Sequence, residues 1–317
     1  MPSSTRSADD LFTLRAGSKR PGAPYLRKYE PENIVTSTAL RRFNPYWMLV
    51  LPVTAAVALL YIAPIINILF LSVTDPQPGL GNYQKLVESD TLIRLIWTTI
   101  RVCLITTFFA VSLGYLVAYT MMHALEGQRR WMLSILMISF WISVLVRTFS
   151  WLMLLGRTGL VNETLISVGV ISDPIAFVRN EVGVLIGMVD YMIPYAVLPL
   201  LANMRGIDPR IMSASRSLGA SNLQTFVRVY LPLTKPGVIA ASLLVFISSL
   251  GFYITPAILG GGKVLMIAEY ISVQLLVTVR WGTAAMLASI MLISVLLLMY
   301  ILNRFMKLGT IFGGDVR

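Results

Sequence analysis

Hydrophobic and polar positions alternate along this chain in blocks of tens of residues. Six stretches of almost unbroken apolar residues fall near residues 47–73, 94–122, 131–156, 182–204, 237–259 and 284–305. Each is long enough to cross about 30 Å of hydrocarbon as an α-helix, which takes about 20 residues. Because a bilayer interior offers backbone groups no water to bond, a spanning segment of this kind is helical. The pattern predicts an all-α integral membrane protein with six transmembrane helices.

Polar tails flank the apolar part of the chain, which we place at residues 45–308. Residues 1–44 contain Ser, Pro and Arg without sustained apolar periodicity, so we expect a largely disordered tail. Residues 309–317 form a second, short tail. The first apolar stretch starts too late and runs too long to be a cleaved signal peptide.

Charge then fixes the expected orientation. The chain is 56% hydrophobic and 13% charged, against about 25% charged residues in soluble domains, and carries a net charge of +11. Most of its Lys and Arg lie in the two tails and in the loops after the second and fourth spans. By the positive-inside rule, both termini and the loop at 206–236 are cytoplasmic. The net charge is therefore a topology signal, and we expect no nucleic-acid partner. The basic residues of the alternate, outer loops are Lys85, Arg157, Arg179, Lys263 and Arg280.

The loop at 206–236 is unusually polar and basic, yet it carries helix signals. Asp208 is placed to cap a helix whose first residue is Pro209. Gly219 is expected to end that helix in a left-handed conformation. The sequence from Ser221 to Gln224 fits a capping box that opens a second short helix. We expect the prolines at 232 and 236 to end that second helix before the fifth span.

The same loop resembles the EAA motif found in permeases of binding-protein-dependent ABC importers. Ser213-Ala214-Ser215 stands in the place of Glu-Ala-Ala, Gly219 falls at the required spacing, and Val229-Tyr230-Leu231-Pro232 completes the motif. This resemblance implies a type I ABC importer permease fold with a cytoplasmic coupling helix. In that family the helix sits in a cleft of the ATPase subunit. Ser213 replaces the family's Glu, so any ion pair made by that carboxylate is absent.

The resemblance also implies a set of coupling residues and partners. The coupling residues would be Arg210, Ser213, Ala214, Ser215, Arg216, Gly219, Ala220, Leu231 and Pro232. The partners would be an ATP-binding cassette ATPase dimer, a second and homologous permease subunit, and an extracytoplasmic solute-binding protein, in the lipid bilayer of a bacterial inner membrane. ATP and Mg would bind the ATPase, so this chain would hold no cofactor and would not be an enzyme. The binding protein would meet the outer loops near 74–92, 157–181 and 260–283.

The ionisable residues Arg147 and Asp190 lie well inside the predicted spans, where charge is costly. Asp190 in the fourth span and Arg147 in the third fall at similar depth below the outer boundary. They could form a structural ion pair, or Asp190 could face a pathway and attract a cationic substrate. Aromatic residues at similar depth could line that pathway or form an interface belt. The candidate pathway residues are Asp190, Arg147, Trp141, Tyr195 and Tyr253.

Within the importer family, several segments resemble the spermidine/putrescine branch. These segments are residues 140–149, 159–162 and 251–261. Members of that branch often carry an acid directly after the glycine that matches Gly251, where this chain has Phe252. The branch also includes transporters that resemble importers of opines and organophosphonates, so these substrates stay open beside polyamines.

Two other classes of protein are weighed against the importer. An ion-coupled secondary transporter could use Asp190 as its carrier, but such folds usually contain internal repeats, and none is visible here. A membrane-embedded enzyme would need clustered His, Cys or acidic residues, and the chain has one His and one Cys.

Overall fold

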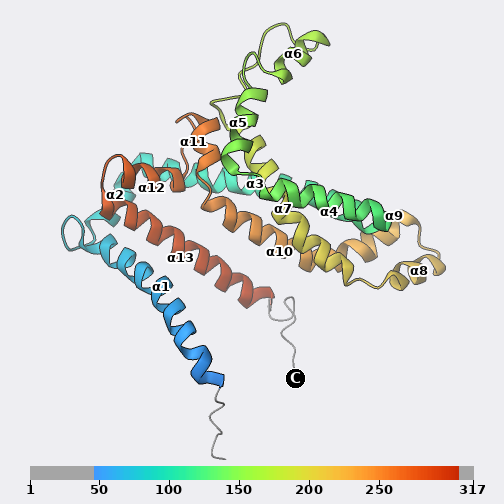
Figure 1. Ribbon diagram of the computed structural model, residues 1–317, viewed down its shortest axis with the longest axis horizontal. Coiled ribbons are helices and arrows are strands. Elements are labelled where there is room, and N and C mark those ends of the chain that lie inside the picture. Colours follow the sequence, from blue (N-terminus) through green and yellow to red (C-terminus); the bar gives the residue numbers. More distant parts are fainter. Residues whose placement is uncertain (1–45, 307–317) are drawn as a thin grey trace, which may run out of the picture. The chain divides into compact units, whose positions relative to one another are not determined.

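The computed structural model describes residues 46–306, and every described helix appears in Figure 1. The tails predicted at 1–44 and 309–317 lie outside the described residues. The chain divides into two units after Ala55. The described part of the first unit is only the start of the first helix, so the packing below concerns residues 56–306.

The described residues form helices and connecting turns, as predicted. Five helices are long and apolar enough to span a membrane, and a sharply bent pair raises the number to six. The single-helix spans are α1 (Tyr46–Thr74), α3 (Asp90–His123), α7 (Glu181–Arg205) and α13 (Trp281–Met306). The bent pair is α4 (Glu126–Trp141) with α5 (Val144–Leu154), and the fifth span ends in α10 (Leu231–Leu250). The shorter helices are α2 (Gly81–Glu88), α6 (Leu160–Ser167), α8 (Pro209–Ser217), α9 (Asn222–Thr225), α11 (Ile254–Gly260) and α12 (Ile267–Leu276).

The third predicted span, 131–156, is not one straight helix. It breaks after Trp141, and α4 and α5 meet at an angle of 96°. Ile142 and Ser143 are extended at the break. An extended residue cannot continue the i to i−4 hydrogen bonds, so the break frees carbonyl groups at the end of α4.

Both boundaries predicted for the fifth span, 237–259, are wrong. The helix begins at Asn222, passes through a π-helical turn at Phe226–Tyr230 and continues as α10 to Leu250. Pro232 does not stop it: the π-helical turn, in which Leu231 N donates to Phe226 O, directly precedes this proline and changes the local hydrogen-bond register. The chain turns at Gly251, and its next residues form the separate helix α11.

The core is centred on α7, which packs against both α3 and α10 (Figure 1). Small residues permit these close approaches. A Cβ atom added to Gly114 of α3 would lie 2.7 Å from Ala196 Cβ of α7, and one added to Gly237 of α10 would lie 2.6 Å from Asn203 Cβ. Close backbone contact of this kind drives helix association in lipid, where apolar burial supplies little force.

We expect Gly114→Ala to destabilise the helix pair α3–α7 by about 1–3 kcal/mol, because the helices must separate to admit a methyl group. The measurement is the unfolding midpoint of the purified chain in detergent micelles. Gly127→Ala is the matched control, since nothing lies within 4 Å of a Cβ added there. A Gly114 variant as stable as this control would show that the close contact is not limiting.

Candidate functional site

The polar loop after α7 folds into a helical hairpin, formed by residues 208–225. The Asp208 side chain accepts a hydrogen bond from Arg210 N at 2.8 Å, and Pro209 occupies the first turn of α8. The predicted cap and proline start are both confirmed. The carboxylate satisfies one of the backbone N–H groups that a helix start leaves free.

Gly219 turns the chain between the two helices of this hairpin. Its φ of +86° lies in the left-handed region, as predicted, where a Cβ would be strained. Ser221 then caps α9: Gln224 N donates to Ser221 Oγ at 3.2 Å, and Ser221 N donates to Gln224 Oε1 at 3.0 Å. This reciprocal pair is the predicted capping box. The Ser215 and Thr225 hydroxyls, 3.2 Å apart, join the two helices.

The outer surface of the hairpin is largely unburied, and it includes apolar side chains. Leu218 is 90% exposed and Leu223 is 72% exposed, and α8 contains no buried residue. Arg210, Ser213, Ala214, Arg216 and Gly219 are exposed as well, while Ser215 and Ala220 are half-buried. Together with Ile211, which is 41% exposed, these leucines leave three apolar side chains uncovered on the hairpin.

The hairpin is attached to α3 through a cluster of aromatic rings. Tyr119 of α3 makes edge contacts with Phe226 and Tyr230 of the π turn, at centroid distances of 5.6 and 5.5 Å. The His123 ring joins this cluster, with its centroid 4.3 Å from that of Tyr119. Edge-to-face pairs at these distances are favourable beyond their burial. The hairpin is therefore packed on one membrane helix and covalently continuous with two others, α7 and α10.

Leu231 and Pro232 belong to α10 and not to the hairpin. Both are exposed residues at the start of α10, directly after the π turn. The sequence placed them at a stop between two elements, and that placement is wrong because the helix runs on through them.

A second site lies at the break in the third span, and Arg147 of α5 is its centre. Its guanidinium donates to the backbone oxygen of Ser139 and, at 2.8 Å, to Ser139 Oγ. In an unbroken helix that oxygen would accept from the amide of residue 143, which is extended here. Arg147 therefore caps the broken end of α4, and its side chain is only 10% exposed.

Asp190 of α7 balances the charge of Arg147. Arg147 Nη1 lies 3.7 Å from Asp190 Oδ2, and Trp151 Nε1 donates to the same oxygen at 3.1 Å. The guanidinium also lies 5.4 Å from the ring centroid of Tyr191. The two residues thus lie within ion-pair distance, one of the two arrangements that the sequence left open, while the Asp190 side chain is still 36% exposed and its role in a pathway stays a prediction.

Aromatic rings continue from this cluster along α7. Tyr191 contacts Phe252 at 4.5 Å and Tyr195 at 5.8 Å, and Tyr195 contacts Phe140 at 5.3 Å. Of the predicted pathway residues, Arg147, Asp190 and Tyr195 are thus brought together. Trp141 is 84% exposed at the end of α4 and Tyr253 is 43% exposed before α11. Neither of these two has a ring–ring contact within the described residues.

Sequence reasoning missed Ser139 and the π turn. Ser139 matters only because the helix breaks three residues later, and the run from Phe140 to Leu145 contains no Gly or Pro to signal a break. The π turn, Phe226–Tyr230, likewise contains no Gly or Pro. Among residues 46–306, no group of three His, Cys, Asp or Glu side chains could hold a metal ion.

We expect Arg147→Met to destabilise the protein by about 2–3 kcal/mol, because it leaves both the Ser139 carbonyl and the Asp190 carboxylate without their partner. Asp190→Asn should cost about 1–2 kcal/mol, because Trp151 can still donate to the amide oxygen while the largely buried Arg147 guanidinium loses its counter-charge. Unfolding midpoints in detergent micelles measure both. Equal losses would show that the ion pair alone, and not the cap on α4, sets the stability.

Comparison with known proteins finds one matching family model and several similar permeases. The model of the family described as "Binding-protein-dependent transport system inner membrane component" matches residues 127–308. A spermidine/putrescine transport system permease protein, PotB of Haemophilus influenzae, is 33% identical over 234 residues, which cover 72% of this chain and 82% of that protein. PotB of Escherichia coli strain K12 is 33% identical over 223 residues, covering 70% and 81% of the two chains.

The fold agrees with that match. A chain of a bacterial ABC transporter involved in import of the acidic polysaccharide alginate superposes with a TM-score of 0.66 at 19% identity. The superposition covers 82% of this chain and 96% of that one. The all-helical permease fold class is thereby confirmed. The family match favours a binding-protein-dependent transporter over an ion-coupled one. The chain belongs to the family of binding-protein-dependent transport system inner membrane components.

Proposed function

We propose that this chain is one of two homologous permease subunits of an ATP-driven importer of polyamines. The observation that carries the mechanism is the hairpin at 208–225, whose two helices are both capped and whose Leu218 side chain is 90% exposed. The observation that carries the substrate class is the identity of 33% with two permeases named for spermidine and putrescine.

The hairpin serves as the docking surface of the ATPase. Ile211, Leu218 and Leu223 offer apolar surface, and Arg210 and Arg216 offer charge in place of the Glu that Ser213 replaces. The ATPase supplies ATP hydrolysis, and its motion passes from the hairpin to α7 and α10, which are continuous with it, and to α3 through Tyr119. Rigid helices joined by packed rings can transmit such a displacement.

Movement of a polyamine cation would depend on aromatic surface more than on Asp190. Arg147 offsets the charge of that carboxylate at 3.7 Å. The half-buried rings of Tyr195 and Phe252 would instead attract ammonium groups, whereas the Tyr191 ring already lies against the Arg147 guanidinium. The second permease subunit would form the rest of the pathway. Both subunits would lie in the inner membrane, and both termini of this chain would be on the cytoplasmic side.

Uptake of radiolabelled putrescine and spermidine tests the substrate class. We expect proteoliposomes that contain the complete transporter and internal ATP to accumulate a polyamine only when the binding protein is added outside. Excess unlabelled amino acids or organophosphonates should not compete. ATP-dependent uptake that an amino acid or a phosphonate abolishes, with polyamines inert, would replace the proposed cargo while leaving the transporter class intact.

Leu218→Glu tests the docking surface. A charge in place of this side chain should prevent the ATPase from co-purifying with the tagged permease, because a carboxylate would have to be buried in an apolar contact. Leu125→Glu is the matched control, since Leu125 is 73% exposed in a loop that charge bias places on the same side. Co-purification that survives Leu218→Glu but is lost with the control would place the ATPase elsewhere.

A further inference from the structure

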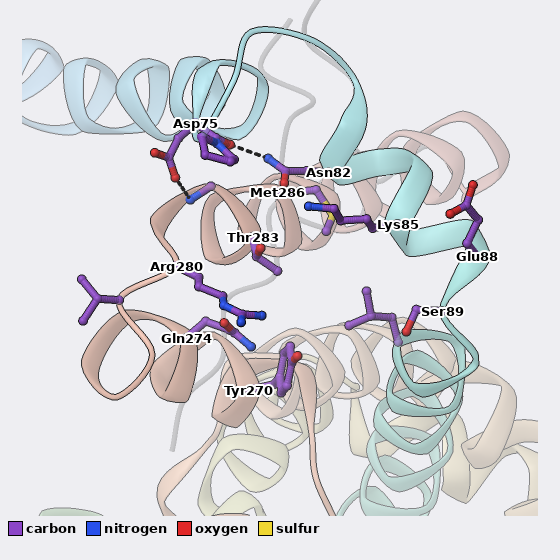
Figure 2. Close-up of a pocket in the computed structure, with 14 residues that line it drawn as sticks. Asp75, Asn82, Lys85, Glu88, Ser89, Tyr270, Gln274, Arg280, Thr283 and Met286 are labelled. Carbon is purple, nitrogen blue, oxygen red and sulfur yellow. Dashed lines mark hydrogen bonds between the residues drawn. The ribbon is translucent and has the colours of Figure 1, made fainter.

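Two cavities near the outer ends of the spans differ in the charges that line them. The first, of about 720 Å³, lies between α2 and the paired helices α12 and α13 (Figure 2). Acidic and basic side chains both line it, so it selects no charged ligand. The second, of about 230 Å³, lies between the end of α5 and the loop before α7. It is lined by Arg157 and Arg179, by three apolar residues and by no acidic residue of the described chain.

A buried side chain holds together the two segments that carry these arginines. Asn162 of α6 is fully buried. Its Nδ2 donates to Gly156 O at 2.9 Å and to Ile175 O at 3.0 Å, and its Oδ1 accepts from Ile175 N at 2.9 Å. Arg157 directly follows the first of these partners, and Arg179 follows the second by four residues. The cavity is therefore a built feature of the loop between α5 and α7.

Arg179 is held in an uncommon backbone conformation. Its φ of +61° lies in the left-handed region, which is costly for a residue with a Cβ atom. Its N–H donates to Leu259 O at 2.7 Å. A Cβ atom added to Gly261 would lie 2.8 Å from Arg179 Cγ, so the stem of the arginine lies against the end of α11. These contacts fix the root of the side chain beside the cavity.

The two guanidinium groups lack a counter-charge. Neither Arg157 nor Arg179 takes part in an ion pair within residues 46–306. Glu181, the acidic residue closest to Arg179 in sequence, is bonded to Arg101 of α3 instead. Both lining arginines are exposed, so water hydrates them until a ligand replaces it. A guanidinium is a planar fork of donors that matches the oxygens of a phosphate group.

An apolar groove of about 440 Å³ adjoins the inner side of this cavity. One stripe of α7 forms most of it, and α3 and α5 add the rest; the apolar lining is Val182, Leu185, Ile186, Val189, Ile193, Phe109, Leu113 and Trp151. The groove and the cavity are neighbours along two elements. Leu155 of the cavity lies one helical turn after Trp151, and its N–H donates to Trp151 O at 2.9 Å. Arg179 precedes Val182 by three residues.

The length of the groove matches one leaflet of a bilayer. From Val182 to Ile193 the helix rises about 16 Å, and half of the hydrocarbon layer is about 15 Å thick. A membrane helix of another subunit would need a groove through both leaflets, whereas an acyl chain needs only one. Asp190 is the one acidic residue of the groove. It lies about 12 Å inward of Val182, and Arg147 balances its charge at 3.7 Å.

We propose that the cavity and the groove together bind one anionic phospholipid of the outer leaflet. The phosphate lies between Arg157 and Arg179, and an acyl chain lies along α7. Charge-assisted bonds from arginine to phosphate fix the headgroup, as in other basic pockets between membrane helices. The lipid ties the bent half of the third span to the fourth span, because one arginine follows α5 and the other precedes α7. This inference goes beyond the proposed function and does not depend on the cargo.

Lipid titration of the purified full-length chain in detergent micelles tests the site, with native mass spectrometry as the readout. We expect phosphatidylglycerol to bind about tenfold or more tightly than phosphatidylcholine with the same acyl chains, because the choline cation would lie beside two arginines. Glycerol phosphate, which has the charge but no acyl chain, should not displace the lipid at equal concentration.

Substitutions assign the binding to its two parts. Arg157→Gln and Arg179→Gln should each raise the dissociation constant of phosphatidylglycerol about tenfold and leave that of phosphatidylcholine within about twofold. The unchanged second value also shows that each variant is folded. Arg280→Gln is the matched control, because it removes an exposed arginine from another outer loop. Val182→Trp places a bulky ring in the exposed mouth of the groove and should weaken both lipids alike.

Several outcomes would overturn the proposal. Equal affinities for the two lipids, or arginine variants that match Arg280→Gln, would refute the headgroup site. Displacement by glycerol phosphate would assign the arginines to a free anion, and displacement by putrescine would assign the groove to the transport pathway. Loss of the lipid when the second permease is added would assign the groove to the subunit interface. Because lipid binding is measured without transport, its failure leaves the proposed function untouched.

Discussion

Every backbone group inside the hydrocarbon layer must find a partner within the protein, and this requirement explains the site at the third span. The helix breaks at Ile142 and Ser143, which frees the Ser139 carbonyl. Arg147 returns from the next helix to bond that oxygen. A guanidinium in this position needs a counter-charge, and Asp190 of α7 supplies it at 3.7 Å. The ion pair is thus a consequence of the break.

Helix α7 connects the features that the proposed mechanism uses. It carries Asp190 and Tyr191 in the membrane, and its end leads directly into the capped hairpin. Gly114 and Gly237 let its two neighbours approach closely, so α3, α7 and α10 form one tightly packed group. Displacement of the hairpin would therefore move packed helices rather than a flexible loop.

Local sequence signals were reliable where neighbouring residues decide the structure. Asp208 capped its helix, Gly219 adopted the left-handed conformation, and Ser221 paired with Gln224, because each of these contacts lies within four residues. The Arg147–Asp190 pair is present at 3.7 Å, but the straight third span on which the depth argument depended is not, because the helix bends by 96° before Arg147. The coupling and docking roles of these residues stay predictions.

The sequence by itself determined the number of spans, their expected orientation and the family, because apolar length, loop charge and motif spacing are properties of the chain alone. Only the tertiary structure decided where the third and fifth spans break and which polar groups bond the backbone groups that the breaks leave free. A run such as Phe140 to Leu145 satisfies a hydropathy pattern equally well whether straight or bent. Its bend is stable because Arg147 and Asp190, distant in sequence, meet there and satisfy what the broken helix leaves free.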